Sequence, residues 1–267
     1  MGRRLMATSV IIILIMLPAS IVGDCGDVND DGDINILDIV YLINYRYKGG
    51  AEPDCGPTGT VTDIDGNIYL TIKIGEQWWM MENLKVTHYR NGDPILYEPD
   101  DYSWTAITIG AYCEYNNDVA YGDAYGRLYN WYAVGDSRNI APEGWHVPTD
   151  DEWKQLEMYL GMSQATADGT LWRGVNEGGK LKETGTMHWL DPNYAATNVY
   201  GFTALPGGSR HYMTGYFSFL GAGSPFWLAT EYDGGSAWMR NLANNHGDIY
   251  RNYTSKSQGF AVRCVKD

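Results

Sequence analysis

A run of twelve residues near the start of the chain restricts its own backbone more tightly than any other stretch does. Oxygen-bearing side chains recur there at alternate positions, and Gly32 stands at the sixth position, where the chain must turn sharply. Calcium takes roughly six to eight oxygen ligands, and an EF-hand loop supplies them with this spacing. An acidic surface turn is the alternative interpretation. The complete ligand set favours a calcium site formed by Asp27, Asn29, Asp31, Asp33 through its backbone carbonyl, Asn35 and Asp38.

The end of this loop and the residues after it predict an apolar helix at 36–47. One stripe of the helix consists of Ile36, Ile39, Val40, Ile43 and Tyr47. An apolar surface of this width is not stable in water, so the helix needs a partner surface. The sequence leaves three candidates open: the rest of this chain, a second copy of the chain, or a separate protein.

Residues 1–23 are typical of a secretory signal peptide. Arg3 and Arg4 provide a basic start, 10–17 are apolar, and small residues such as Ala19 and Gly23 follow. An uncleaved membrane anchor is the alternative, but the apolar run is shorter than the ~20 residues that span a bilayer. We therefore expect a secreted or cell-surface protein with no membrane span in the mature chain.

Charge and cysteine content restrict the partners and the compartment. The formal net charge of −14 repels polyanions, so nucleic-acid binding is not expected. The four cysteines, Cys25, Cys55, Cys113 and Cys264, favour disulfides outside the cytoplasm. Of the possible connectivities we prefer Cys25–Cys55 with Cys113–Cys264, because the first pair brackets the predicted calcium loop. A metal-binding or catalytic thiol is the alternative, and the sequence has no CxxC or Cys/His cluster that supports it.

Glycine and proline punctuation divides the mature chain into a small module at 24–56, a linker at 57–60 and a large domain at 61–267. The richness in Gly, Tyr and Trp is typical of secreted, loop-rich domains, in which amphipathic rings pack beneath irregular backbone.

The large domain begins with a hairpin pattern, in which apolar residues alternate at 61–64 and at 68–74. A helix is predicted at 149–160, with Thr149 as its N-cap and Glu152 completing a capping box. Glycine pairs and aromatic runs beyond this helix indicate short strands joined by long ordered loops. The predicted fold class is α+β.

The calcium segment resembles a dockerin type I repeat. The run that carries the resemblance is GDVNDDGDINILDIVYLINYRYKGG, in which Asp38 closes the loop and an apolar helix follows at once. Dockerins carry two such repeats, and their helices bind a cohesin module. One repeat is visible here, so the resemblance implies calcium binding more directly than it implies a cohesin partner.

The large domain carries an ordered series of motifs. They are DIDGNIYLTIKIGEQWWMMENLKV at 63–86, YGRLYNWYAV at 125–134, APEGWHVPTDDEWKQLEMYLG at 141–161, GGKLKETGTMHW at 178–189, GFTALPGGSR at 201–210, FWLATEYDGGSAWMRNL at 226–242 and GFAVRCVKD at 259–267. By this series, residues 61–267 resemble the Fibrobacter succinogenes major paralogous domain (FISUMP) family. The resemblance implies a secreted bacterial protein with a fold similar to C-type-lectin-like domains and to formylglycine-generating enzymes. It implies no defined activity.

Catalysis is not expected. Formylglycine-generating enzymes need a pair of reactive cysteines, and the sequences around Cys113 and Cys264 do not look like that site. The histidines are scattered without metal-ligand spacing, at His88, His146, His188, His211 and His246.

Carbohydrate binding is one expectation for the large domain. Calcium-dependent lectins use Glu-Pro-Asn or Gln-Pro-Asp loops, to which Glu98-Pro99-Asp100 and Asp191-Pro192-Asn193 are superficially similar. Five tryptophans spread through predicted loops should anchor them by core packing: Trp145, Trp153, Trp189, Trp227 and Trp238. Two glycine pairs should permit turns with positive φ: Gly207, Gly208, Gly234 and Gly235.

The sequence thus predicts a non-catalytic, secreted or cell-surface interaction or adhesion protein with structural calcium. A glycan or a protein is its expected partner. The alternatives are a relative of the formylglycine-generating enzymes and a cohesin-docked component of an extracellular polysaccharide-degrading assembly.

Overall fold

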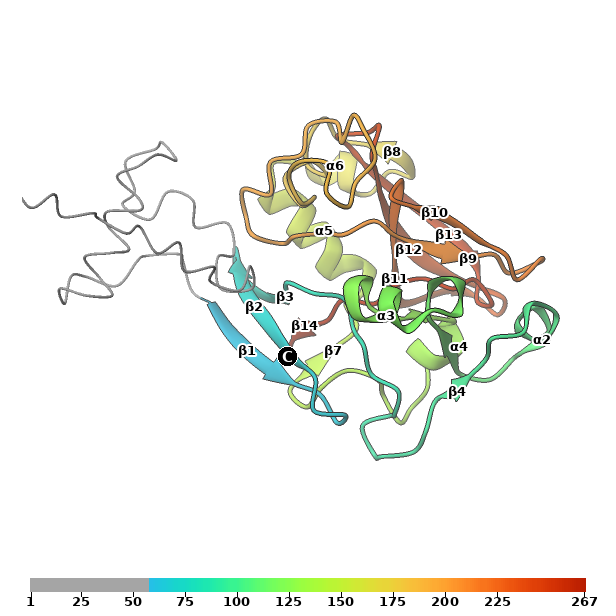
Figure 1. The fold of residues 1–267 in the computed structure, drawn as a ribbon. Coiled ribbons are helices and arrows are strands. Elements are labelled where there is room, and N and C mark those ends of the chain that lie inside the picture. Colours follow the sequence, from blue (N-terminus) through green and yellow to red (C-terminus); the bar gives the residue numbers. More distant parts are fainter. Residues whose placement is uncertain (1–57) are drawn as a thin grey trace, which may run out of the picture. The chain divides into compact units, whose positions relative to one another are not determined.

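The computed structural model describes residues 58–267, which form an α+β domain built mainly of strands (Figure 1). These residues form four sheets. None of their helices has the length and apolar character needed to cross a membrane. The predicted signal peptide, calcium loop, helix at 36–47 and Cys25–Cys55 pair lie outside the described residues.

The first sheet joins the two ends of the described domain. In spatial order it contains β1 (Thr58–Thr62), β2 (Ile68–Ile74), β3 (Gln77–Met80), β14 (Val265–Lys266) and β7 (Trp145–His146). β1 and β2 form the predicted antiparallel hairpin, with Val61 opposite Tyr69. Residues 58–60, predicted to belong to a linker, are part of β1, because their backbone pairs with β2 from Thr58 onward in spite of Gly59.

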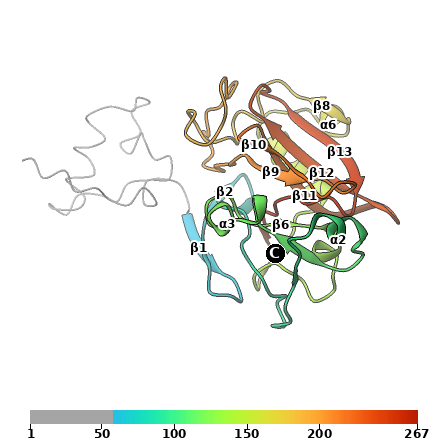
Figure 2. The same ribbon diagram turned by 45° about the vertical axis from the view of Figure 1, so that its right-hand side comes forward.

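The second sheet is antiparallel throughout, and its long strands lie side by side (Figure 2). It consists of β11 (Gly223–Asp233), β12 (Ser236–Ala243), β13 (Ile249–Ser255) and β8 (Leu171–Arg173). The hairpin of β9 (Gly207–Arg210) and β10 (Phe217–Leu220) contacts β11. A small mixed sheet consists of β4 (Leu96–Tyr97), β5 (Ala111–Cys113) and β6 (Leu128–Tyr129). The prediction of short strands joined by long ordered segments is confirmed.

The helices of the described residues are short. They are α2 (Asp101–Ala106), the 3-10 turn η1 (Tyr115–Asn117), α3 (Val119–Tyr125), α4 (Trp131–Val134), α5 (Asp150–Tyr159) and α6 (Gln164–Ala167). α5 confirms the predicted helix and its capping box. The hydroxyl of Thr149 accepts from the backbone N–H of Glu152 at 3.2 Å, and the Glu152 carboxylate accepts from the N–H of Thr149 at 2.7 Å.

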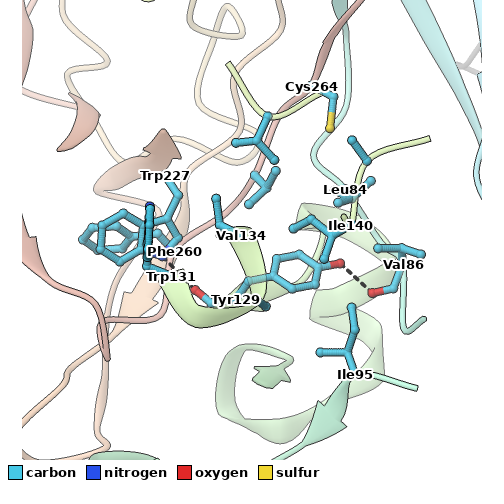
Figure 3. Close-up of a cluster of buried hydrophobic side chains, with 14 of the residues drawn as sticks. Leu84, Val86, Ile95, Tyr129, Trp131, Val134, Ile140, Trp227, Phe260 and Cys264 are labelled. Atoms are coloured by element: carbon cyan, nitrogen blue, oxygen red, sulfur yellow. Dashed lines mark hydrogen bonds between the residues drawn. The ribbon is translucent and has the colours of Figure 1, made fainter. Parts of the chain in front are cut away.

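Aromatic side chains fill the core, as Figure 3 shows for one cluster. The rings of Trp227 and Phe260 are 4.8 Å apart, and the buried Tyr129 hydroxyl donates to the backbone carbonyl of Val86 at 2.7 Å. Of the five tryptophans, Trp238 is partly buried and the other four are buried, which confirms their packing role. Their predicted location in loops is correct for Trp189, whereas the others lie in β7, α5, β11 and β12.

The predicted Cys113–Cys264 disulfide is wrong, because both residues are free thiols. Cys264 packs in the cluster that contains Tyr129 and Trp227 (Figure 3), and Cys113 packs in a separate cluster around Trp104. An even number of cysteines favours pairing only when the fold brings them together. Here each thiol serves as a small apolar core group. Burial raises the pKa of Cys113 to about 12 and also raises that of Cys264 far above its usual value.

Candidate functional site

Segments that are far apart in the sequence meet at a cavity of about 250 Å³. Most of its lining is polar or aromatic. The lining consists of Met81, Glu82, Asn83, Lys85, Asp123, Ala124, Tyr125, Gly126, Glu183, Thr203, Leu205 and Arg263. All of these except Asp123 and Ala124 belong to the motifs on which the family resemblance rests. The cavity is therefore a place where five of those motifs converge.

A second cavity, of about 210 Å³, lies between residues 62–64 and 140–143. Two of its charged side chains, Arg90 and Asp63, are already bound within the protein. Arg90 donates to the backbone carbonyls of Ala141 and Pro142 at 3.0 and 2.8 Å, and the Asp63 carboxylate accepts from the hydroxyl of Tyr69. Because these groups are occupied, we take the first cavity as the candidate site.

Arg263 forms a rigid floor for this cavity. Its side chain is fully buried, and its guanidinium donates to the Asn83 side-chain oxygen at 2.8 Å and to the backbone carbonyls of Phe202 and Thr203. Burial lowers the pKa of Arg263 to about 9, and the negative charge of Glu82 opposes this shift. Asn83 in turn donates to the backbone carbonyl of Tyr125 at 2.8 Å. Arg263 and Asn83 thus link the segments around residues 125 and 202–203 to their own, and the Arg263 guanidinium already binds acceptors of the protein.

Three other polar side chains of the lining, Glu82, Lys85 and Asp123, have fewer partners within the protein. One carboxylate oxygen of Glu82 accepts from the backbone N–H of Leu70 at 3.0 Å, and the other has no hydrogen-bond partner within residues 58–267. Lys85 and Asp123 form no ion pair with any described residue, and Asp123 is exposed. These side chains leave hydrogen-bonding capacity for a ligand.

Tyr125 provides an aromatic wall next to these groups. Its ring is half-buried, and it meets the His188 ring edge-on at a centroid distance of 5.6 Å. Burial and the nearby charge of Glu183 raise the pKa of its hydroxyl, so Tyr125 stays neutral and able to donate. His188 pairs with the Glu183 carboxylate at 2.9 Å, which fixes that carboxylate at the cavity edge.

The structure gives other roles to residues of both lectin-like tripeptides. The carbonyls of Glu98 and Pro99 accept from the buried Arg210, and Asp100 caps α2. Asn193 has a different role, because its amide donates to the carbonyls of Glu183 and Gly185 and so holds the cavity edge. Among residues 58–267, no group of three or more His, Cys, Asp or Glu is placed to hold a metal ion.

The scattered placement of the histidines is confirmed. His188 borders the cavity, and the other four pair with different residues elsewhere: His88 with Asp65, His146 with Glu152 and Asp267, His211 with Thr214, and His246 with Asp248. Sequence reasoning did not single out Glu82, Lys85, Asp123, Tyr125, Glu183 or Arg263. For all of these except Asp123, membership in the motifs was the one sequence signal that could have pointed to them. Spacing could not, because the residues come from five separate segments.

Comparison with protein families gives one match. The model of the Fibrobacter succinogenes major domain (Fib_succ_major) matches residues 72–266. No curated protein and no solved structure matches the chain. The matched range includes every residue that lines the cavity.

Proposed function

The chain belongs to the Fibrobacter succinogenes major domain family, and from this premise we propose that it is an exported, non-catalytic protein that binds glycans in the cavity beside Tyr125.

The unused polar groups next to a tyrosine ring carry this proposal. Glu82 has a carboxylate oxygen to spare, and Lys85 and Asp123 have no ionic partner among the described residues. A sugar offers hydroxyl groups that donate to carboxylates and accept from ammonium groups. It also offers an apolar ring face that packs on an aromatic side chain. Such a combination of a few polar groups with an aromatic wall is typical of small-molecule sites.

The state of the thiols supports binding without turnover. A relative of the formylglycine-generating enzymes would need two reactive cysteines. Cys113 and Cys264 lie in separate clusters, both are fully buried, and burial raises the pKa of each thiol. A buried neutral thiol is a poor nucleophile and a poor metal ligand.

The rest of the chain fits an extracellular setting in this proposal. The segment at 1–23 directs export, and calcium in the loop at 27–38 has a structural role. The helix at 36–47 is then presented to a cohesin module, another surface protein or a second copy of the chain. For the large domain we propose a C-type-lectin-like fold, which its short strands and long ordered segments support.

Glycan binding can be tested with the purified exported chain. An array of neutral and charged glycans identifies binders, and calorimetry then measures their affinity. Tyr125→Ala should weaken binding about tenfold, which corresponds to about 1.4 kcal/mol. Tyr232→Ala is the matched control, because Tyr232 is also accessible to solvent but stacks on Tyr253 within the second sheet. If no glycan binds, or if Tyr125→Ala binds as tightly as the parent, the proposal fails.

Calcium binding needs a separate test. Titration of the chelator-treated chain with calcium should show one site, and the double substitution of Asp27 and Asp38 by Ala should remove it. Asp54→Ala is the control, since Asp54 is an acidic residue outside the predicted loop. Unchanged calcium uptake in the double variant would contradict the assignment.

A further inference from the structure

The geometry around the cavity points to a longer binding surface, and we propose that it takes a linear, uncharged polysaccharide along a row of aromatic rings that starts at the cavity. This inference rests on the proposed function, because it names the class of glycan for the same site.

The row consists of four aromatic rings in series. The ring of Tyr125 is 6.2 Å from that of Tyr121, both in α3, and Tyr121 is 5.6 Å from Tyr115 in η1. Tyr115 in turn is 5.2 Å from Phe217 in β10. The cavity contains Tyr125, so the row begins at the site already described and leads away from it. We call these four residues the aromatic row.

Each residue of the aromatic row is half-buried, so each leaves part of its side chain open to solvent. The inner sides of Tyr115 and Phe217 pack against the small core cluster around Trp104. The tyrosine hydroxyls add polar groups along the path, and burial raises the pKa of Tyr115 and Tyr125 so that both remain neutral donors. A surface of this kind suits a ligand that alternates apolar faces with hydroxyl groups.

The glycine pair at 207–208 accounts for the position of the rings. A Cβ on Gly207 would lie 3.1 Å from the Tyr125 Cβ, and a Cβ on Gly208 would lie 2.8 Å from the Tyr115 ring. Gly208 also has a φ of 69°, as predicted, whereas Gly207, Gly234 and Gly235 do not have positive φ. Two adjacent glycines in β9 thus give room for two members of the aromatic row, Tyr125 and Tyr115. A core-packing role alone would not require the rings to stay half-exposed.

Spacing and charge select the ligand class. Neighbouring rings are separated by 5.2 to 6.2 Å, which is comparable to the length of one pyranose unit. A chain of several units can therefore contact several rings in turn, whereas a monosaccharide contacts only the cavity. Asp118 at the N-cap of α3 and Asp123 within α3 are exposed, and the chain as a whole is acidic, so polymers of uronic acids are repelled.

The test is the dependence of affinity on ligand length. Calorimetry with the exported chain uses disaccharides, tetrasaccharides and hexasaccharides of β-1,4-linked glucose, xylose and mannose, with oligogalacturonate as the acidic comparison. For at least one neutral series, the hexasaccharide should bind about tenfold more tightly than the disaccharide. Oligogalacturonate should not bind. Tyr121→Ala and Tyr115→Ala should each remove most of the gain from length and leave disaccharide affinity nearly unchanged.

The outcomes separate this inference from the proposed function. If none of these oligosaccharides binds, this inference is refuted, while the proposed function fails only if no glycan of the array binds. If the disaccharide and the hexasaccharide bind equally, or if Tyr232→Ala reduces the gain as much as Tyr121→Ala, the aromatic row has no such role. The length dependence of the parent protein is informative even if Tyr115→Ala fails to fold, because it requires no variant.

Discussion

Glu157 offers a sharp test of what holds α5 to the second sheet. Its side chain is fully buried, and one carboxylate oxygen accepts from Arg173 in β8 at 2.8 Å and from Arg240 in β12 at 2.7 Å. Asp150, at the start of the same helix, pairs with Arg240 and Arg251 at 2.8 and 2.7 Å. Two buried carboxylates and three buried guanidinium groups thus form one cluster with a formal charge of +3 − 2 = +1. Lys154 also contacts Asp150, at 3.3 Å, but it pairs with Asp151 and Asp168 outside this cluster as well.

The substitution Glu157→Leu removes one negative charge and raises this local charge to +2. Arg173 then remains buried with no carboxylate partner in the cluster, while Arg240 keeps Asp150. Breaking a buried ion pair from one side costs about 3–5 kcal/mol. The free energy of unfolding of a domain is about 5–15 kcal/mol, so the loss should be about a fifth of it or more. Adding Arg173→Met returns the local charge to +1 and should recover a large part of the loss.

Urea unfolding at neutral pH, followed by tryptophan fluorescence, measures these differences. The control is Glu76→Leu, because Glu76 is almost fully exposed in its pair with Lys73 at 3.3 Å and should leave the midpoint unchanged. A change of less than about 1 kcal/mol for Glu157→Leu would refute the reasoning. So would a double variant that is less stable than the single variant, since the unpaired Arg173 would then not be the source of the loss.

Two further properties of the chain can be predicted from buried or paired groups. Hydrogen bonds to the carboxylates of Glu152 and Asp267 raise the pKa of His146. Burial alone would raise the pKa of Glu152, but hydrogen bonds from His146 and Thr149 lower it to about 2. The stabilisation by this pair is therefore greatest between pH 4.5 and 6.5, the ordinary pKa values of the two groups. It is lost as the pH rises through the raised pKa of His146, and also as the pH falls toward the lowered pKa of Glu152 at about 2. Thermal unfolding of His146→Gln should differ most from the parent in that window, and a difference independent of pH would contradict the assignment. The thiols of Cys113 and Cys264 should resist alkylation in the native protein and both react after unfolding without reductant, as mass spectrometry can show. Protection that persists after unfolding would indicate a disulfide instead.

Local signals in the sequence predicted local structure well. α5 was predictable because Thr149, Glu152 and the apolar spacing all lie within one short segment, and each acts on its own neighbours. The β1–β2 hairpin was predictable for the same reason. The state of Cys113 and Cys264 was not, because it depends on which cluster each residue joins. Composition favours a disulfide, but it contains no information on distance.

The cavity could not be predicted from spacing for the same physical reason. Its lining comes from five motifs and one end of α3, so the polar groups become neighbours only in the folded domain. The ordered series of motifs did indicate which segments matter. It did not indicate that Glu82, Tyr125 and Glu183 would line one cavity, since each of these residue types is common on protein surfaces.

Buried basic side chains explain how so much irregular backbone stays ordered. Loop carbonyls lack the ladder partners that strands provide, and a buried carbonyl without a donor is costly. Lys182 donates to three backbone carbonyls at 2.8 to 2.9 Å, and Arg90 donates to three more. Arg210 and Arg263 bind carbonyls of further loops in the same way. One buried cation thus supplies the hydrogen-bond donors that several backbone carbonyls would otherwise receive from a neighbouring strand. Because Arg263 is also the floor of the cavity, the interactions that order the loops fix the shape of the candidate site before any ligand arrives.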